Sequence, residues 1–187
     1  KGALLHHRGL VNNGAHTMER LGVRDGAVWI TMMPLFHTGG CVLCVLGAVA
    51  RRATSVVVPA FDPGLVLELM ETYGAEALLG VPTMLVALLE HPDFARRDLS
   101  ALRAITSGGS TVPAALVRRF EEELGADFTI VFGQTECSPV ASMSHPDDTL
   151  EDKAGTLGPP MPNVEVKIVD PETGEIVPHG VKGEYCT

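Results

Sequence analysis

Residues 102–136 read LRAITSGGSTVPAALVRRFEEELGADFTIVFGQTE. Within this stretch, Leu102–Thr106 and Phe128–Phe132 are short segments, rich in apolar and β-branched residues, that favour strands, and each leads into glycine. Between them, Pro113–Leu124 carries its apolar side chains on one helical face and is followed by Gly125, which is typical of a helix with a C-terminal glycine. A strand, a helix and a strand in this order predict a βαβ unit on a parallel sheet.

The same alternation extends towards the N-terminus. Val28–Met33, Ser55–Val58 and Ala77–Val81 are apolar or β-branched runs that predict three more strands. Pro63–Tyr73 has helical periodicity, and Pro82–Glu90 predicts a helix with proline in its first turn. The pattern as a whole therefore predicts an α/β fold with a mainly parallel sheet.

The pattern changes in the C-terminal part of the chain, where glycine and proline interrupt regular structure. Val164–Val169 and Glu175–Val177 flank a turn and predict an antiparallel hairpin, and Gly183–Thr187 begins a further strand. We therefore expect a parallel-sheet α/β subdomain over residues 1–153 and the beginning of an antiparallel, β-rich subdomain over residues 154–187.

Composition and charge exclude several classes of partner. The chain has 187 residues, of which 45% are hydrophobic and 20% charged, as in a folded globular protein. Its net charge of −9 and the lack of a basic block argue against binding to nucleic acid or to an anionic membrane. The longest apolar run, Cys41–Ala50, is shorter than the roughly 20 residues that a transmembrane helix needs. The sequence does not predict an oligomeric state.

The four cysteines are scattered, and only Cys41 and Cys44 form a C-x-x-C pattern. This pair lies in an apolar stretch without a second cysteine pair nearby, so we interpret it as buried and reduced rather than as a zinc or redox site. Reduced cysteines indicate a cytoplasmic protein.

Two stretches at the predicted carboxyl ends of strands carry unusual chemistry, and ligands bind at these ends of parallel sheets. The glycines of Ser107–Ser110 allow the backbone to approach a base or phosphate, although a plain tight turn explains them equally well. Phe132–Glu136 provides an aromatic ring for a base, a hydroxyl for a phosphate and a carboxylate for Mg²⁺. The alternative is that Phe132 is a core residue and Glu136 a solvated one.

A third such stretch, Pro34–Gly40, places His37 after a buried strand. A single histidine is more often structural than catalytic, so both interpretations stay open. Small and apolar residues at Gly39, Gly80, Val81 and Met84 suggest an apolar pocket. The sequence has no G-x-G-x-x-G, no G-x-x-x-x-G-K-[ST] and no G-x-S-x-G motif.

Together these stretches resemble the adenylate-forming enzymes, which include acyl-CoA synthetases, luciferases and peptide-synthetase adenylation domains. Phe132–Glu136 resembles their aromatic-Gly-x-Thr-Glu motif, and Pro34–Gly40 resembles the P-L-F-H segment of fatty-acyl-CoA synthetases. Ser107–Ser110 lies where the family has an S-G-G-A-type turn. Gly155–Pro160 and Gly180–Cys186 look like its G-x-x-G-x-P and G-x-x-G-E-L segments. The five motifs follow the family order over nearly the whole chain.

The resemblance implies an ATP-dependent reaction in two steps. A carboxylate, here expected to be a fatty acid, attacks the α-phosphate of Mg·ATP to give acyl-AMP and pyrophosphate, and the thiol of coenzyme A then takes the acyl group. The implied ligands of ATP or AMP are Ser107, Gly108, Gly109, Ser110, Phe132, Gly133, Gln134 and Thr135. The implied acyl pocket is His37, Gly39, Gly80, Val81 and Gly108. The implied catalytic residues are His37, Thr135 and Glu136. Of these, Thr135 would contact the α-phosphate and Glu136 would bind Mg²⁺.

The resemblance also implies parts that this chain does not contain. Lys1-Gly2 looks like the end of the family's phosphate loop, and the ribose-binding aspartate and the swivelling C-terminal domain with its catalytic lysine would follow Thr187. We therefore expect the 187 residues alone to be inactive. Two alternatives stay open, an adenylation domain that loads a carrier protein and a nucleotide-binding module without chemistry.

Overall fold

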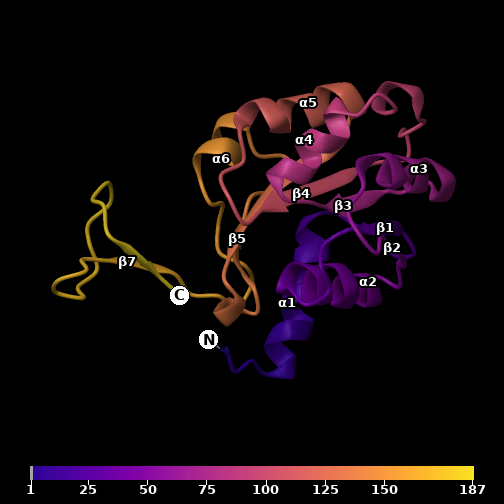
Figure 1. The fold of residues 1–187 in the computed structure, drawn as a ribbon. Helices are drawn as coiled ribbons and strands as arrows, with labels where there is room; N and C mark the ends of the chain where they lie inside the picture. Colours follow the sequence, from indigo (N-terminus) through magenta and orange to yellow (C-terminus); the bar gives the residue numbers. More distant parts are fainter. Residues whose placement is uncertain (1) are drawn as a thin grey trace.

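The computed structural model describes residues 2–187 (Figure 1). Lys1, to which we assigned the end of a phosphate loop, lies outside the described residues. The strands are β1 (Val28–Thr31), β2 (Thr54–Val57), β3 (Ala77–Leu79), β4 (Ala104–Gly108), β5 (Asp127–Gly133), β6 (Val140–Met143), β7 (Lys167–Val169) and β8 (Glu184–Cys186). The helices are α1 (His7–Arg20), η1 (Gly39–Leu46), α2 (Gly47–Ala50), α3 (Pro63–Tyr73), α4 (Pro82–Glu90), η2 (Phe94–Arg96), α5 (Ala114–Leu124), η3 (Thr135–Cys137) and α6 (Leu150–Gly155).

Six strands form one sheet in the order β2-β1-β3-β4-β5-β6. Neighbouring strands are parallel from β2 to β5, and β6 pairs antiparallel with β5. β7 and β8 form a separate antiparallel sheet. The predicted fold class, a parallel α/β sheet followed by antiparallel strands on another sheet, is therefore confirmed.

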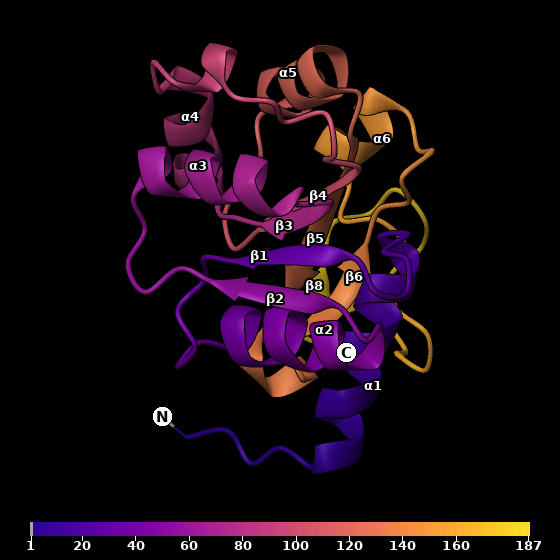
Figure 2. The ribbon, with the colours of Figure 1, turned by 90° about the vertical axis from the view of Figure 1, so that its right-hand side faces the viewer.

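Helices cover both faces of the large sheet. Figures 1 and 2 show α3, α4 and α5 on one face and α1 and α2 on the other. Neighbouring residues of one strand consequently belong to different cores: Ile30 packs with the cluster beneath α3–α5, and Trp29 packs with the cluster beneath α1 and η1. Because both faces are covered, consecutive residues of the central strands β3 and β4 are all buried rather than alternating between core and solvent.

The two ends of α3 follow from local sequence. At its start, Asp62 accepts a hydrogen bond from the backbone N–H of Leu65 (2.7 Å), and Pro63 occupies the first turn. At its end, Gly74 adopts the left-handed conformation with φ of 61°. The predicted range Pro63–Tyr73 is confirmed at both ends, as is Pro82–Glu90 for α4.

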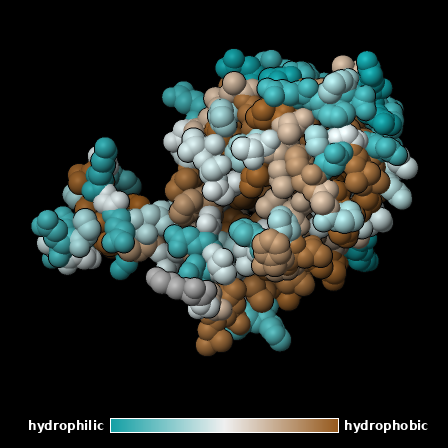
Figure 3. All heavy atoms as spheres, viewed as in Figure 1, coloured by the Kyte–Doolittle hydropathy of each residue, from teal (hydrophilic) through white to brown (hydrophobic). Residues whose placement is uncertain are grey.

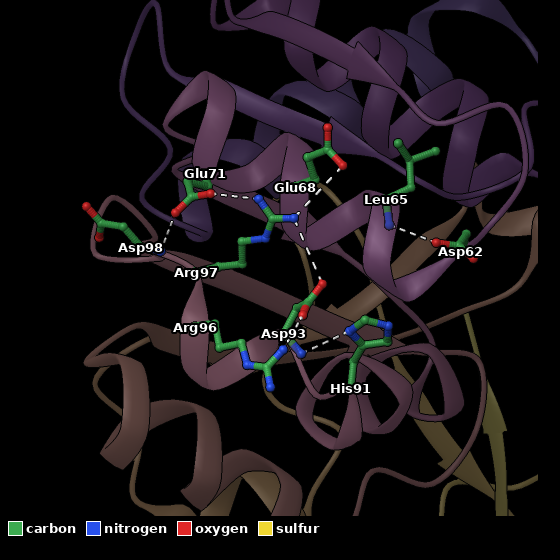
Figure 4. Close-up of polar contacts among 9 residues, drawn as sticks. All are labelled: Asp62, Leu65, Glu68, Glu71, His91, Asp93, Arg96, Arg97 and Asp98. Carbon is green, nitrogen blue, oxygen red and sulfur yellow. Dashed lines mark hydrogen bonds and ion pairs between the residues drawn. The ribbon is translucent and has the colours of Figure 1, made fainter.

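Charged residues attach the loop after α4 to α3 (Figure 4). Glu71 on α3 accepts a hydrogen bond from the backbone N–H of Asp98 (2.9 Å) and pairs with the Arg97 guanidinium (2.9 Å). The hydrogen bond from the Asp98 N–H has the larger effect and that from the Arg97 guanidinium the smaller, and both lower the pKa of Glu71 below its ordinary value. These groups face solvent, so each ion pair contributes little to stability.

The sequence did not predict α1, although it is one of the longest helices of the described chain. Asn12, Asn13 and Gly14 in its middle are poor helix formers. Packing stabilises the helix instead, because Asn13, Gly14, Thr17 and Met18 are buried. The surface over α1 and α2 is rich in hydrophobic residues, whereas the surface over α5 is hydrophilic (Figure 3).

The interpretation of Cys41 and Cys44 as a buried pair is wrong for one member. Both lie in η1, where Cys44 is buried and Cys41 is exposed, because successive side chains of a helix point in different directions. Burial raises the pKa of the Cys44 thiol to about 12. The cytoplasmic location inferred from the cysteines stays a prediction. Within residues 2–187, no helix has both the length and the hydrophobicity needed to cross a bilayer.

The predicted C-terminal hairpin is present but short. The Val177 N–H donates to the Ile168 carbonyl (3.0 Å) and the Asp170 N–H to the Glu175 carbonyl (2.9 Å), on either side of an antiparallel bridge between Val169 and Ile176. Pro178 follows directly and lacks the N–H that a longer ladder would need. β7 also pairs with β8, which was not predicted. The further strand expected at Gly183–Thr187 is present as β8.

The boundary predicted between residues 153 and 154 falls inside α6. This helix is hydrogen-bonded to α5, which belongs to the α/β part of the chain. The buried Lys153 ammonium donates to the Glu121 carboxylate of α5 (2.7 Å). The division into residues 1–153 and 154–187 stays a prediction.

Candidate functional site

The main candidate site lies at the carboxyl ends of the parallel strands. A cavity of about 560 Å³, here called the first cavity, is bordered by the segments that follow β1, β3, β4 and β5. Its lining residues are Met33, Pro34, Phe36, His37, Thr38, Gly39, Leu43, Leu79, Gly80, Val81, Met84, Gly108, Gly109, Val131, Gly133, Gln134, Thr135, Pro139 and Val140. No Asp, Glu, Lys or Arg of the described chain lines this cavity.

A second cavity of about 420 Å³ adjoins the first. Its lining residues are Gly109, Ser110, Thr111, Val112, Ile130, Val131, Phe132, Gly133, Lys153, Ala154, Gly155, Thr156 and Leu157. Gly109, Val131 and Gly133 line both cavities. The two spaces therefore meet where the ends of β4 and β5 lie side by side.

The structure distributes the predicted site residues between these spaces. His37, Gly39, Gly80, Val81, Gly108, Gln134 and Thr135 line the first cavity, Ser110 and Phe132 line the second, and Gly109 and Gly133 line both. Ser107 and Glu136 line neither. Ser107 is fully buried in β4, and its hydroxyl has no hydrogen-bond partner among residues 2–187. Glu136 is exposed in η3.

Glycine is required at the junction for two physical reasons. Gly109 has φ of 80°, a conformation that other residues rarely adopt. A Cβ at Gly108 would overlap the carbonyl oxygen of Val131, and one at Gly133 would overlap that of Pro139. The backbones of neighbouring strands therefore approach each other closely here, and the space beside them stays free of side chains.

His37 is held by the backbone that follows it. Its Nδ1 accepts a hydrogen bond from the Gly39 N–H (2.9 Å), so in the neutral ring Nε2 carries the proton. The ring is exposed to solvent and borders the first cavity. His37 can therefore offer an N–H donor to a ligand there. Phe36, beside it, borders the same cavity with 93% of its surface exposed.

Gln134, Thr135 and Glu136 are held by a turn that folds back on β6. The Gln134 N–H donates to the Pro139 carbonyl (2.9 Å), and the Cys137 N–H donates to the Gln134 carbonyl (2.9 Å). Within residues 2–187, the Glu136 carboxylate makes no hydrogen bond or ion pair, and no three metal-binding side chains cluster. A single free carboxylate suits Mg²⁺, which is usually bound by one or two carboxylates together with water and substrate phosphates.

Sequence reasoning missed Asn13, which fixes β6 and thereby one wall of the first cavity. Its side-chain amide donates to the Val140 carbonyl (2.8 Å) and accepts from the Val140 N–H (3.0 Å). Asn13 is 7% exposed and thus bonds β6 much as a neighbouring strand would. The polar residues in the middle of α1 were a possible signal, but sequence alone does not say what a buried asparagine contacts.

Arg20 supports the same region from the end of α1. Its Nη1 donates to the carbonyls of Met143 (3.0 Å) and Pro159 (3.1 Å), and its Nη2 donates to that of Pro160 (3.2 Å). Burial lowers the pKa of Arg20 from its ordinary value, and the charge of Asp148 partly opposes this shift. α1 therefore fastens both ends of β6 to the body of the protein.

Comparison with known proteins gives consistent matches. The family described as AMP-binding enzyme matches residues 1–187. The chain is 40% identical over 188 residues to a protein of Bacillus subtilis named as an acyl-CoA synthetase, YngI. It is 35% identical over 192 residues to the mitochondrial medium-chain acyl-CoA ligase ACSF2 of Rattus norvegicus. Both matches cover all of this chain but only 34% and 31% of the relatives, so the chain spans about a third of their length.

Solved structures agree with these matches. ATP-bound MatB from Rhodopseudomonas palustris superposes with a TM-score of 0.87 at 29% identity, over 99% of this chain and 36% of MatB. The O-succinylbenzoate coenzyme A synthetase MenE from Bacillus subtilis, in complex with ATP and magnesium, superposes with a TM-score of 0.85 at 25% identity, over 99% of this chain and 37% of MenE.

Proposed function

The chain belongs to the AMP-binding enzyme family, and on that premise we propose that the full-length protein is an ATP-dependent acyl-CoA ligase. One observation supports this most strongly. Two cavities of different character meet at Gly109 and Gly133, at the carboxyl ends of β4 and β5. An acyl-adenylate has two parts of correspondingly different character, a nucleotide and an acyl chain, joined at a phosphate.

We assign the nucleotide to the second cavity and the acyl group to the first. Phe132 provides an aromatic ring that can stack on adenine, and Ser110 provides a hydroxyl beside it. The exposed backbone at Gly109 lets the nucleotide lie close to the end of β4. In this arrangement the α-phosphate lies near the shared edge, within reach of Thr135.

The first step joins two anions, so the site must neutralise charge. A carboxylate oxygen of the acid forms a bond to the α-phosphorus, and the bond from that phosphorus to pyrophosphate breaks. Thr135 donates a hydrogen bond to an α-phosphate oxygen, and Glu136 holds the metal that accompanies the phosphates. Bound Mg²⁺ supplies positive charge that stabilises the pentavalent phosphorus and the leaving pyrophosphate.

The second step releases the acyl group to coenzyme A. The thiol sulfur bonds to the acyl carbon, the thiol proton is lost, and AMP leaves with the electron pair of the broken mixed anhydride bond. His37 borders the first cavity with a free N–H, and we assign it to orient the acyl carboxylate at the junction of the two cavities. Such orientation lowers the barrier by holding the reacting atoms in place.

The apolar lining favours an apolar acyl chain. Leu43, Leu79, Val81, Met84 and Val140 contribute aliphatic or thioether side chains to the first cavity. A charged group on the far end of the acid would be buried there without a counter-charge, which costs free energy. We therefore propose a fatty or similar monocarboxylic acid as the substrate.

The test is pyrophosphate release by the full-length protein, with octanoate and octanedioate compared at equal concentration. We expect release that requires ATP and acid and that continues over many turnovers only with coenzyme A, with kcat/KM for octanoate at least about tenfold above that for the dicarboxylate. Release that does not depend on coenzyme A but increases with a carrier protein would favour the adenylation-domain alternative. Nucleotide binding without pyrophosphate release would indicate a nucleotide-binding module without chemistry. The 187-residue chain, assayed alongside, is expected to be inactive.

A further inference from the structure

An aromatic contact connects the small sheet to the second cavity. The rings of Tyr185 on β8 and Phe132 on β5 lie with centroids 5.0 Å apart and planes at 74°, an edge-to-face arrangement. Such pairs are favourable beyond the area that they bury. Phe132 lines the second cavity, whereas Tyr185 lines neither cavity, so Tyr185 touches the site only through another side chain.

A hydrogen bond fixes the other end of the tyrosine. Its hydroxyl lies 2.7 Å from the Ser142 hydroxyl, and Ser142 is 1% exposed on β6. Ser142 is also the cross-strand partner of Phe132 in the β5–β6 pair. Tyr185 therefore contacts both members of one cross-strand pair, one through its ring and the other through its hydroxyl.

This geometry restricts the Phe132 ring. Phe132 is only half-buried and borders open space, so without a neighbour its ring would have room to change rotamer. Tyr185 closes one side of that ring, and its own orientation is set by Ser142 and by the pairing of β8 with β7.

We propose that Tyr185 is a positioning residue that holds the Phe132 ring in the orientation that stacks on adenine. The inference rests on the proposed function, because it assumes that the second cavity binds the nucleotide. It adds that nucleotide affinity depends on a residue of the separate β7–β8 sheet. Tyr185 touches no reacting atom and acts on ATP binding alone.

The test substitutes Tyr185→Leu in the full-length protein, which removes the ring. We expect KM for ATP, and the Kd for AMP measured by titration calorimetry, to rise about two- to tenfold, as the energy of one aromatic pair implies. We expect kcat and KM for octanoate to stay within about twofold of the parent values, because the first cavity and the reacting groups are untouched. Tyr185→Phe keeps the ring and should retain most of the affinity for ATP.

Tyr73→Leu is the matched control, since Tyr73 is exposed at the end of α3 and lines neither cavity. It should change neither KM for ATP nor Kd for AMP. Thermal unfolding of each variant identifies a loss of fold. If Tyr185→Leu fails to fold, Tyr185→Met, which fills the space without a ring, takes its place.

Equal affinity for AMP in the parent and in the folded ring-less variant would overturn the inference and leave the proposed function intact. A matched rise in both KM values, or a fall in kcat alone, would also overturn it, because either result indicates a general structural role. If the parent protein binds neither ATP nor AMP, the proposed function fails and this inference fails with it.

Discussion

Asn13→Ala should loosen β6 and with it one wall of the first cavity. The substitution leaves the N–H and the carbonyl of Val140 without their present partners. A buried backbone group that loses its partner costs about 1–3 kcal/mol. Because partial access of water would offset some of this cost, we expect the two groups together to lower the free energy of unfolding by about 2–4 kcal/mol.

The assay is urea unfolding of the full-length protein, followed by circular dichroism, together with KM for octanoate. Asn12→Ala is the matched control, because Asn12 is the exposed neighbour on the same helix and should change stability by less than about 0.5 kcal/mol. Since Val140 lines the first cavity, Asn13→Ala should also raise KM for the acid. Equal stability of the two variants would refute the idea that Asn13 holds β6.

Three further predictions concern the junction, the cysteines and a surface ion pair. Gly133→Ala should lower both stability and activity, because the new Cβ would overlap the Pro139 carbonyl, and thermal unfolding beside pyrophosphate release measures both. At pH 8, iodoacetamide followed by mass spectrometry should label the exposed Cys41 well before Cys44, whose buried thiol has a pKa of about 12 and stays protonated; equal labelling would contradict this. Glu71 has a lowered pKa in the folded protein, so its stabilising effect is present above about pH 4.3 and is lost as the pH falls through the folded-state value. Glu71→Gln should accordingly lower the unfolding temperature at pH 7 but not at pH 2.

The sequence predicted the parallel sheet because strand and helix signals there are local. For α3, the capping aspartate, the first-turn proline and the terminal glycine determine both ends without help from the rest of the protein. The glycine-rich turn and the stretch Phe132–Glu136 stood out for a similar reason, since their chemistry is visible in a few consecutive residues.

Features that depend on distant residues could not be predicted in this way. Asn13 and Val140 are 127 positions apart, and nothing near Asn13 indicates its partner. α1 itself is stabilised by burial against the sheet rather than by helix propensity. The pairing of β7 with β8 was not predicted, because β8 lies further along the chain than the hairpin segment Glu175–Val177. The division of the site into two cavities depends on how closely β4 and β5 approach, which sequence does not specify.

The most direct test of the proposed function is acid-dependent exchange of pyrophosphate with ATP, measured at saturating Mg²⁺ for the full-length protein and for Glu136→Gln. The substitution keeps the shape of the side chain but removes the charge assigned to the metal. Glu122→Gln is the control, because Glu122 is exposed on α5 and lines neither cavity.

We expect the parent and the control to exchange equally, and Glu136→Gln to exchange about 10²–10³-fold more slowly, as when a comparable transition-state contact is lost. All three proteins should unfold within about 0.5 kcal/mol of one another, since both glutamates are exposed. No exchange by the parent protein would contradict the assignment as an acyl-CoA ligase. Exchange by Glu136→Gln at the parent rate would show that Glu136 does not bind the metal. Loss of both exchange and fold would show that Glu136 is a structural residue.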